Sequence, residues 1–242
     1  MSKYIIVIFL CLLGVSCKTV SVNKQPQILT ETSVELGSIG LLNGTLIAHT
    51  YESIAIPTFE KELKLSVQSV SFSKQTFKAF ARANERTQKV ALNFSDSLKV
   101  KPTYALLQFV DRVAITDELN NTKNTGVRSY LEHKKDAQMV TSISVAFSEK
   151  QLNQLKKATE VFLVQSPSKK FSLQLTNLNG EKQLLDFSDG VVFTYQTSSF
   201  CWKENNRHKL VIADIVSDSE GCPPNTHRKS EKAIQKNDLF KL

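Results

Sequence analysis

The hydrophobic period of the chain changes from two residues to about 3.6 residues at Ser73. Apolar and polar residues alternate over 63–72, and Phe77 and Phe80 then follow at helical spacing. The hydroxyl of Ser73 can cap a helix, and Phe72 and Phe77 stand at the positions of a hydrophobic staple. The pattern predicts a strand followed directly by a helix.

A second change of period occurs at Ser148. Alternation over Ile143–Phe147 gives way to a helical stripe from Leu152 to Phe162, and Ser148 and Gln151 have the spacing of a capping box. The pair Ser166–Pro167 is a helix stop. The pattern predicts a second strand–helix junction, with a helix that ends at this stop.

The two junctions belong to a longer internal echo. Val70–Ser73 is matched by Val145–Ser148 at an offset of 75 residues, and Leu106–Val113 is matched by Leu184–Val191 at an offset of 78. Two ordered matches with similar offsets predict a tandem duplication. Chance resemblance between amphipathic elements is the alternative.

Each predicted half has the order strand, helix, strand, strand, strand, in which Val90–Phe94 and Phe171–Leu175 are the strands after the helices. Hairpin turns are expected at Asn43–Gly44, Asn179–Gly180 and Asp189–Gly190. Consecutive hairpins imply antiparallel pairing, so the predicted class is α+β with antiparallel sheets. The expected parts are a leader at 1–17, a flexible tether at 18–32, a first half at 33–120, a second half at 121–224 and a basic tail at 225–242. Asn120–Gly126 is the expected loop between the halves, and the tail is expected to be either a weak helix or mobile.

The leader has the three parts of a secretory signal peptide. Lys3 supplies a positive charge, Ile5–Leu13 is an unbroken apolar run, and small residues precede Cys17. Crossing a bilayer takes about 20 apolar residues, so a transmembrane helix is the weaker alternative. Export from the cytoplasm is therefore expected.

The residues Gly14–Cys17 resemble the lipobox of bacterial lipoproteins. The resemblance implies a diacylglycerol on the Cys17 sulfur, with palmitate-type acyl chains that anchor the protein to a membrane of the cell envelope. Lys18, where inner-membrane retention would favour Asp, favours the outer membrane. Secretion without a lipid is the alternative.

The mature chain keeps two cysteines, Cys201 and Cys222, in the oxidising compartment that the leader predicts. A disulfide closing a loop of about 20 residues is the favoured interpretation. Two free thiols are one alternative, and a zinc site completed by His208 and His227 is another.

The chain carries a formal net charge of +8, and its positive residues are scattered rather than interleaved with aromatic ones. This pattern predicts a solvated basic surface and no nucleic-acid partner. The sequence contains no nucleophile elbow, phosphate-binding glycine loop or His-Glu-x-x-His motif. We therefore expect no catalytic residue, metal ion or cofactor.

Asp111 and Asp189 occupy matching positions in the two echoes. A duplicated fold could bring them together as an acid–base pair or a cation site, but the favoured interpretation is that each forms a hairpin corner. Trp202, beside Cys201, is either the tip of a recognition loop or local core. Asp96–Leu98 resembles an O-glycosylation acceptor of one group of Gram-negative bacteria, with Ser97 as the modified residue.

Together these features favour a non-catalytic cell-envelope lipoprotein that binds or helps to assemble another envelope protein. One alternative is a lipoprotein that binds a glycan or a small apolar molecule in a cleft between the halves. A second is a hydrolase that uses Asp111 and Asp189.

Overall fold

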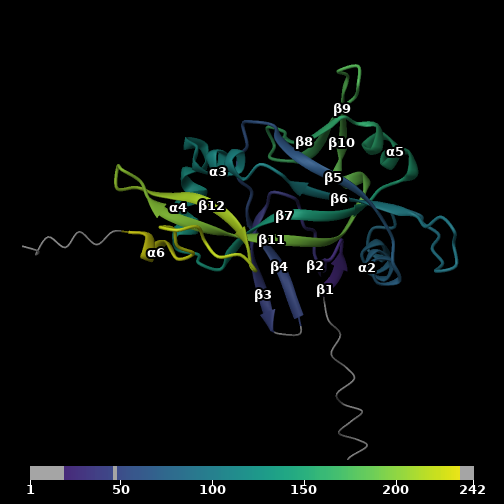
Figure 1. Ribbon diagram of the computed structural model, residues 1–242, viewed down its shortest axis with the longest axis horizontal. Coiled ribbons are helices and arrows are strands. Elements are labelled where there is room, and N and C mark those ends of the chain that lie inside the picture. The colour runs from purple at the N-terminus through teal and green to yellow at the C-terminus, as the bar shows by residue number, and fades with distance from the viewer. Residues whose placement is uncertain (1–18, 46–47, 235–242) are drawn as a thin grey trace, which may run out of the picture.

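The computed structural model describes residues 19–45 and 48–234 (Figure 1). Cys17 and the rest of the leader lie outside the described residues. The strands are β1 Thr19–Val22, β2 Gln25–Leu29, β3 Ile39–Thr45, β4 Ala48–Ala55, β5 Leu63–Ser71, β6 Thr103–Phe109, β7 Ala137–Ala146, β8 Glu160–Gln165, β9 Phe171–Thr176, β10 Lys182–Asp186, β11 Val191–Glu204 and β12 Leu210–Ser217. The helices are α2 Lys74–Glu85, α3 Arg112–Asn120, α4 Thr125–Glu132, α5 Glu149–Lys157 and α6 Ser230–Ala233, with short 3₁₀ turns η2 Thr122–Asn124 and η3 Phe187–Asp189.

The strands form one antiparallel sheet, so the chain is an α+β protein, as predicted. The main order is β1-β2-β11-β7-β6-β5-β8-β9-β10, while β12 pairs with β11, and β3 pairs with β4 and β7. The halves expected at 33–120 and 121–224 are interleaved, because β6 pairs with β7 and β5 pairs with β8. A tandem duplication is not shown.

Both faces of the central strands are covered. Leu106 belongs to an apolar cluster with Phe72, Phe80 and Phe193, on the face where α2 packs. Its neighbour Leu107 belongs to the larger cluster on the other face. Successive strand residues point to opposite faces, so β6 is buried on both sides. In Figure 1, α3, α4 and α6 lie toward one end of the molecule with β12, and α5 lies toward the other with β8, β9 and β10. None of the helices in the described part of the chain is long and apolar enough to cross a bilayer.

The two strand–helix junctions are confirmed. Ser73 Oγ accepts a hydrogen bond from the Thr76 amide at 3.2 Å, and the rings of Phe72 and Phe77 lie 5.8 Å apart. Ser148 Oγ accepts from the Gln151 amide, and Gln151 Oε1 accepts from the Ser148 amide at 3.1 Å, which completes the predicted capping box.

The second predicted helix is wrong beyond residue 157. Helix α5 ends at Lys157, the next residue is extended, and Glu160–Gln165 is strand β8. The run Val161–Val164 has two β-branched residues and an aromatic one, which pack well on a pleated surface, and pairing with β5 and β9 overrides the helical spacing.

The flexible tether is also wrong, because its residues form β1 and β2. Val20 and Val22 are buried at alternate positions of β1, and Gln27 of β2 is buried as well. The connecting residues Asn23 and Lys24 both have positive φ, which suits a two-residue hairpin turn. Residues 19–29 therefore belong to the folded body.

Three further expectations on turns and loops are corrected. Asn43 and Gly44 lie inside β3, paired with β4, rather than at a turn. Asp189 ends η3 and Gly190 leads into β11, which does not pair with β10, so this segment joins no hairpin. The expected loop Asn120–Gly126 contains η2 and the start of α4.

Val90–Phe94 is not a strand; the Asn84 side chain donates to the Val90 carbonyl at 2.8 Å. The turn at Asn179–Gly180 between β9 and β10 is confirmed by φ of +77° at Gly180 and a 2.9 Å bond from its amide to Asn177.

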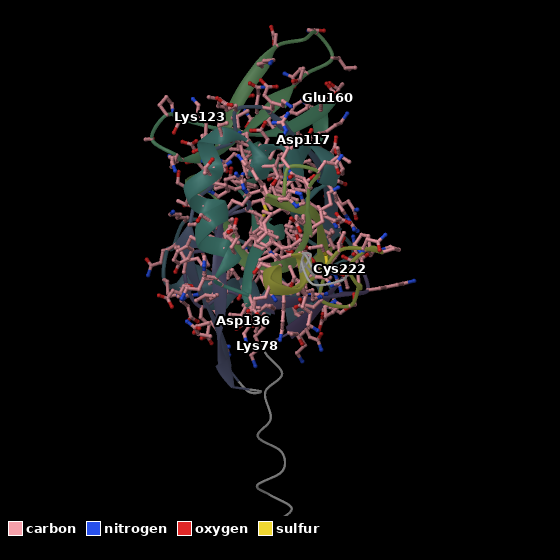
Figure 2. The ribbon with its side chains drawn as sticks, turned by 90° about the vertical axis from the view of Figure 1, so that its left-hand side faces the viewer. Lys78, Asp117, Lys123, Asp136, Glu160 and Cys222 are labelled. Carbon is pink, nitrogen blue, oxygen red and sulfur yellow. A yellow bond between two sulfur atoms is a disulfide. The ribbon has the colours of Figure 1, made fainter. Side chains whose placement is uncertain are left out.

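The predicted disulfide is present. Cys201 and Cys222 are joined, with their Cα atoms 5.7 Å apart, and the Cys222 sulfur is visible in Figure 2. The part of the tail up to residue 234 packs on the body: the His227 and Trp202 backbones exchange two hydrogen bonds, and Ser230 Oγ donates to the Glu132 carbonyl at 2.5 Å.

Candidate functional site: a groove between β5 and α5

A groove lies where β5 and β8 separate. The two strands pair over only three residues, Leu63–Leu65 with Val161–Leu163. Beyond that point β5 continues alone to Ser71, because the chain that would continue β8 backwards is helix α5 instead. The divergence leaves a hollow of about 320 Å³ between the β5 edge and α5.

Helix α5, beside the groove, is held in place by its N-terminal cap and by two buried leucines. The Ser148–Gln151 capping box fixes its start, and Leu152 and Leu155 are buried against the sheet. Lys156 lies on the exposed side and reaches the Thr103 hydroxyl at 3.4 Å. The apolar lining of the groove comes from Leu65, Val67, Ala105, Leu152, Leu155 and Val161.

The β5 edge beside the groove presents free backbone groups. The Phe72 amide donates to the Pro102 carbonyl at 3.0 Å, in line with the β5–β6 register that pairs Ser71 with Thr103. Hydrogen-bonded and non-bonded pairs alternate in an antiparallel ladder. Even-numbered residues of β5 therefore bond to β6, and the odd-numbered Val67, Ser69 and Ser71 direct their N–H and C=O groups away from β6.

The charges at the groove are unevenly compensated. Lys64 Nζ forms an ion pair with Glu160 at 2.8 Å at one end, between side chains that are about half exposed. Lys156 lies toward the other end, where its described contact is the neutral hydroxyl of Thr103, the register partner of Ser71. An ion pair between exposed side chains contributes little to stability, so the groove cations remain available to a bound carboxylate.

A second hollow of about 390 Å³ lies on the other side of Lys156. It shares Leu152 and Lys156 with the groove, so the two hollows adjoin at these residues. Its wall includes Leu98 and Val100, which are 41% and 86% exposed. Two large apolar side chains at the surface beside a hollow are typical of a contact surface.

The two aspartates predicted as a possible pair are far apart. Asp111 caps α3 by accepting from the Ala114 amide at 2.9 Å, and Asp189 ends η3. Val191, two residues after Asp189, pairs with Ala146 at the end of β7. The neighbouring Val145 pairs with Ala105 near the start of β6, whereas Asp111 follows the end of β6. At about 3.4 Å per residue, the stretch from Ala105 to Asp111 separates these ends by roughly 20 Å. The acid pair that the hydrolase needs is not formed, and the expected hairpin corners are a helix cap and a 3₁₀ turn.

The other predicted residues are dispersed. Trp202 is buried, with 3% exposed, so it is core beside the disulfide and the recognition tip is wrong. Ser97 lies on an exposed loop and contacts the Ser95 hydroxyl at 2.7 Å. No group of three or more potential metal ligands occurs among residues 19–45 and 48–234. Positive and negative side chains occupy several sides of the molecule, as Lys123, Asp136 and Glu160 illustrate (Figure 2).

Sequence reasoning missed the groove. Its helix was located from the capping box at Ser148, but the prediction carried that helix through Phe162 and so concealed β8. The signal that could have found it is the β-rich run Val161–Val164 after Lys156 and Lys157, which are typical of a helix end.

No family model, no curated protein and no solved structure matches the chain.

Proposed function

We propose that the protein is a cell-envelope lipoprotein, anchored through Cys17, whose body is a non-catalytic module that binds another envelope protein in the groove between β5 and α5. The observation that carries the proposal is the free edge of β5 facing a hollow lined by both apolar and charged side chains. A strand edge with unsatisfied backbone groups is a template for binding another chain.

The position of the anchor supports a partner at the membrane surface. Cys17 precedes Thr19, the first residue of β1, by two positions. Two residues span at most about 7 Å, so a lipid on Cys17 holds the body close to the bilayer. The outer membrane is the proposed site, because Lys18 follows the lipidated cysteine.

The test uses the tagged full-length protein, cross-linked in its native membranes and then purified. Lys156→Glu reverses the charge that lines both hollows, and Lys157→Glu makes the same change at an exposed neighbour that lines neither. We expect a stoichiometric envelope protein that Lys156→Glu and Cys17→Ala each reduce at least tenfold and that Lys157→Glu retains. Equal capture by the two glutamate variants, or no partner above background, would contradict the proposal.

Anchoring is tested separately by fractionation. The wild-type protein is expected in the membrane fraction, and Cys17→Ala is expected in the soluble fraction. If Cys17→Ala stays with membranes, the lipid anchor is wrong, whatever the groove binds.

A further inference from the structure

Resting on this proposed function, we infer that the partner enters the groove as an extended segment, which adds a strand to the free edge of β5 and places a carboxylate against Lys156. The inference specifies the chemistry of the partner, and the structure supports it in three steps.

The first step is the chemical character of the edge. The unpaired part of β5, from Ser66 to Ser71, has no proline, no charged residue and no bulge in its register with β6. Proteins use these devices to prevent a free edge from pairing with other chains. The outer strand β10, in contrast, carries Lys182 and Asp186 in ion pairs with Glu62 and Lys170. The β5 edge is therefore open where another edge is protected.

The second step is the length and pattern of the occupant. Val67, Ser69 and Ser71 offer three sets of N–H and C=O groups, which match an added strand of about five residues, or about 17 Å. Alternate side chains of such a strand face the side of the sheet where Leu152 and Leu155 are buried. The segment is therefore apolar at every second position, and an apolar residue beyond its end fits beside Leu98 and Val100.

The third step is charge. Lys156 lies where the two hollows meet, and exposed Lys150 and Lys157 share its helix. One glutamate, Glu149, accompanies these three lysines on α5. Lys156 reaches Thr103, the register partner of Ser71, so an Asp or Glu side chain or a terminal carboxylate near the Ser71 end of the added strand would meet it. This charge complementarity selects an acidic extended segment.

The experiment selects heptapeptides from a random phage-displayed library on the full chain, with Ser69→Pro as the counter-selection target. Proline removes the Ser69 amide, which points away from β6, and its ring blocks an added strand, whereas it leaves the β5–β6 ladder intact. Ser69→Ala is the matched control, because it changes the side chain and keeps the amide. Thermal melting of both variants checks that the fold is retained.

We expect enriched peptides that alternate apolar residues and contain Asp or Glu. A synthetic copy should bind Ser69→Pro at least tenfold more weakly than it binds wild type and Ser69→Ala. N-methylating the same copy at alternate residues should weaken its binding to wild type by a similar factor, a readout independent of whether Ser69→Pro folds. No enrichment over the counter-selection, or equal binding by the N-methylated copy, would overturn strand addition.

The two proposals fail in different ways. If Ser69→Pro captures a membrane partner that Lys156→Glu does not, the proposal of an envelope partner in the groove stands and strand addition is overturned. Peptides that meet both criteria without a partner in native membranes would support strand addition and contradict the assignment to an envelope partner.

Discussion

The side-chain amide of Asn120 makes two hydrogen bonds with the backbone of Ile212. Its Nδ2 donates to the Ile212 carbonyl at 2.7 Å, and its Oδ1 accepts from the Ile212 amide at 3.0 Å. The last residue of α3 thus pairs with the outer edge of β12 as a strand residue would. The edge of β12 is occupied here, in contrast to that of β5.

Asn120→Asp should destabilise the protein at this point. The substitution keeps the size of the side chain but replaces the donor to Ile212 with an oxygen, so two acceptors face each other. We expect the free energy of unfolding, measured by urea denaturation, to fall by about 2 kcal/mol. Asn153→Asp, at an exposed position of α5, is the control and should change it by less than about 0.5 kcal/mol. Equal effects would show that the Asn120 pair contributes nothing specific.

A second prediction concerns the buried polar cluster under β2. Gln27 Oε1 accepts from the hydroxyls of Ser144 and Thr194, and Gln27 Nε2 donates to the Ser142 hydroxyl. Gln27→Leu would leave these buried hydroxyls without their partner, at a cost of about 2–4 kcal/mol in stability. Gln25→Leu changes the same residue type at an exposed position of the same strand and should be nearly neutral. If both variants melt together with wild type, β2 is not held by this cluster.

The same residues explain which parts of the fold the sequence could predict. Both helix starts were predictable, because the groups that cap α2 and α5 are local: Ser73, Ser148 and Gln151 act within one turn. Strand β2 was not, because Gln27 is polar and is stabilised in the interior by residues more than 100 positions away. The local pattern of apolar and polar residues predicts that such a residue is exposed to solvent.

The candidate site illustrates the same limit. Its helix could be predicted in part, but its groove depends on where β8 leaves β5, and that point is set by pairing between residues about 100 positions apart. The spacing of Asp111 and Asp189 suggested a shared site, yet the strand register puts them at opposite ends of the central strands. Only the cysteine pair, Cys201 and Cys222, was correctly brought together from composition and compartment.

The third prediction concerns this disulfide. Cys201 and Cys222 are 21 residues apart in sequence, so the cross-link should stabilise the fold by about 3 kcal/mol through the entropy of the unfolded chain. The Cys201→Ala/Cys222→Ala variant should unfold at correspondingly lower urea concentration under oxidising conditions. Wild type treated with dithiothreitol should approach the variant, whose own stability should not change. A variant as stable as the oxidised wild type would contradict the prediction.

The fourth prediction is a pH dependence that arises from Tyr195. Burial raises the pKa of its phenol to about 12, and the nearby Glu31 acts in the same direction. In the unfolded chain the pKa is about 10, so folding favours the neutral phenol. This contribution to stability is complete below pH 10 and is lost as the pH rises from 10 to 12. Burial also raises the pKa of Tyr104 to about 12 and that of Tyr51 further still, so wild type should lose stability steeply in this range.

Tyr195→Phe isolates the contribution of the Tyr195 phenol to the loss of stability above pH 10. The Tyr195 hydroxyl has no hydrogen-bond partner among the described residues, so removing it should leave the free energy of unfolding at pH 7 equal to or higher than that of wild type. Between pH 10 and pH 12 the variant should lose less stability than wild type, while Tyr104 maintains part of the slope. Urea denaturation at each pH, followed through the fluorescence of buried Trp202, provides the measurement. Tyr130→Phe, at a position 46% exposed, is the control and should follow wild type throughout. A Tyr195→Phe curve that runs parallel to that of wild type above pH 10 would show that the phenol ionises as readily in the folded protein as in the unfolded chain.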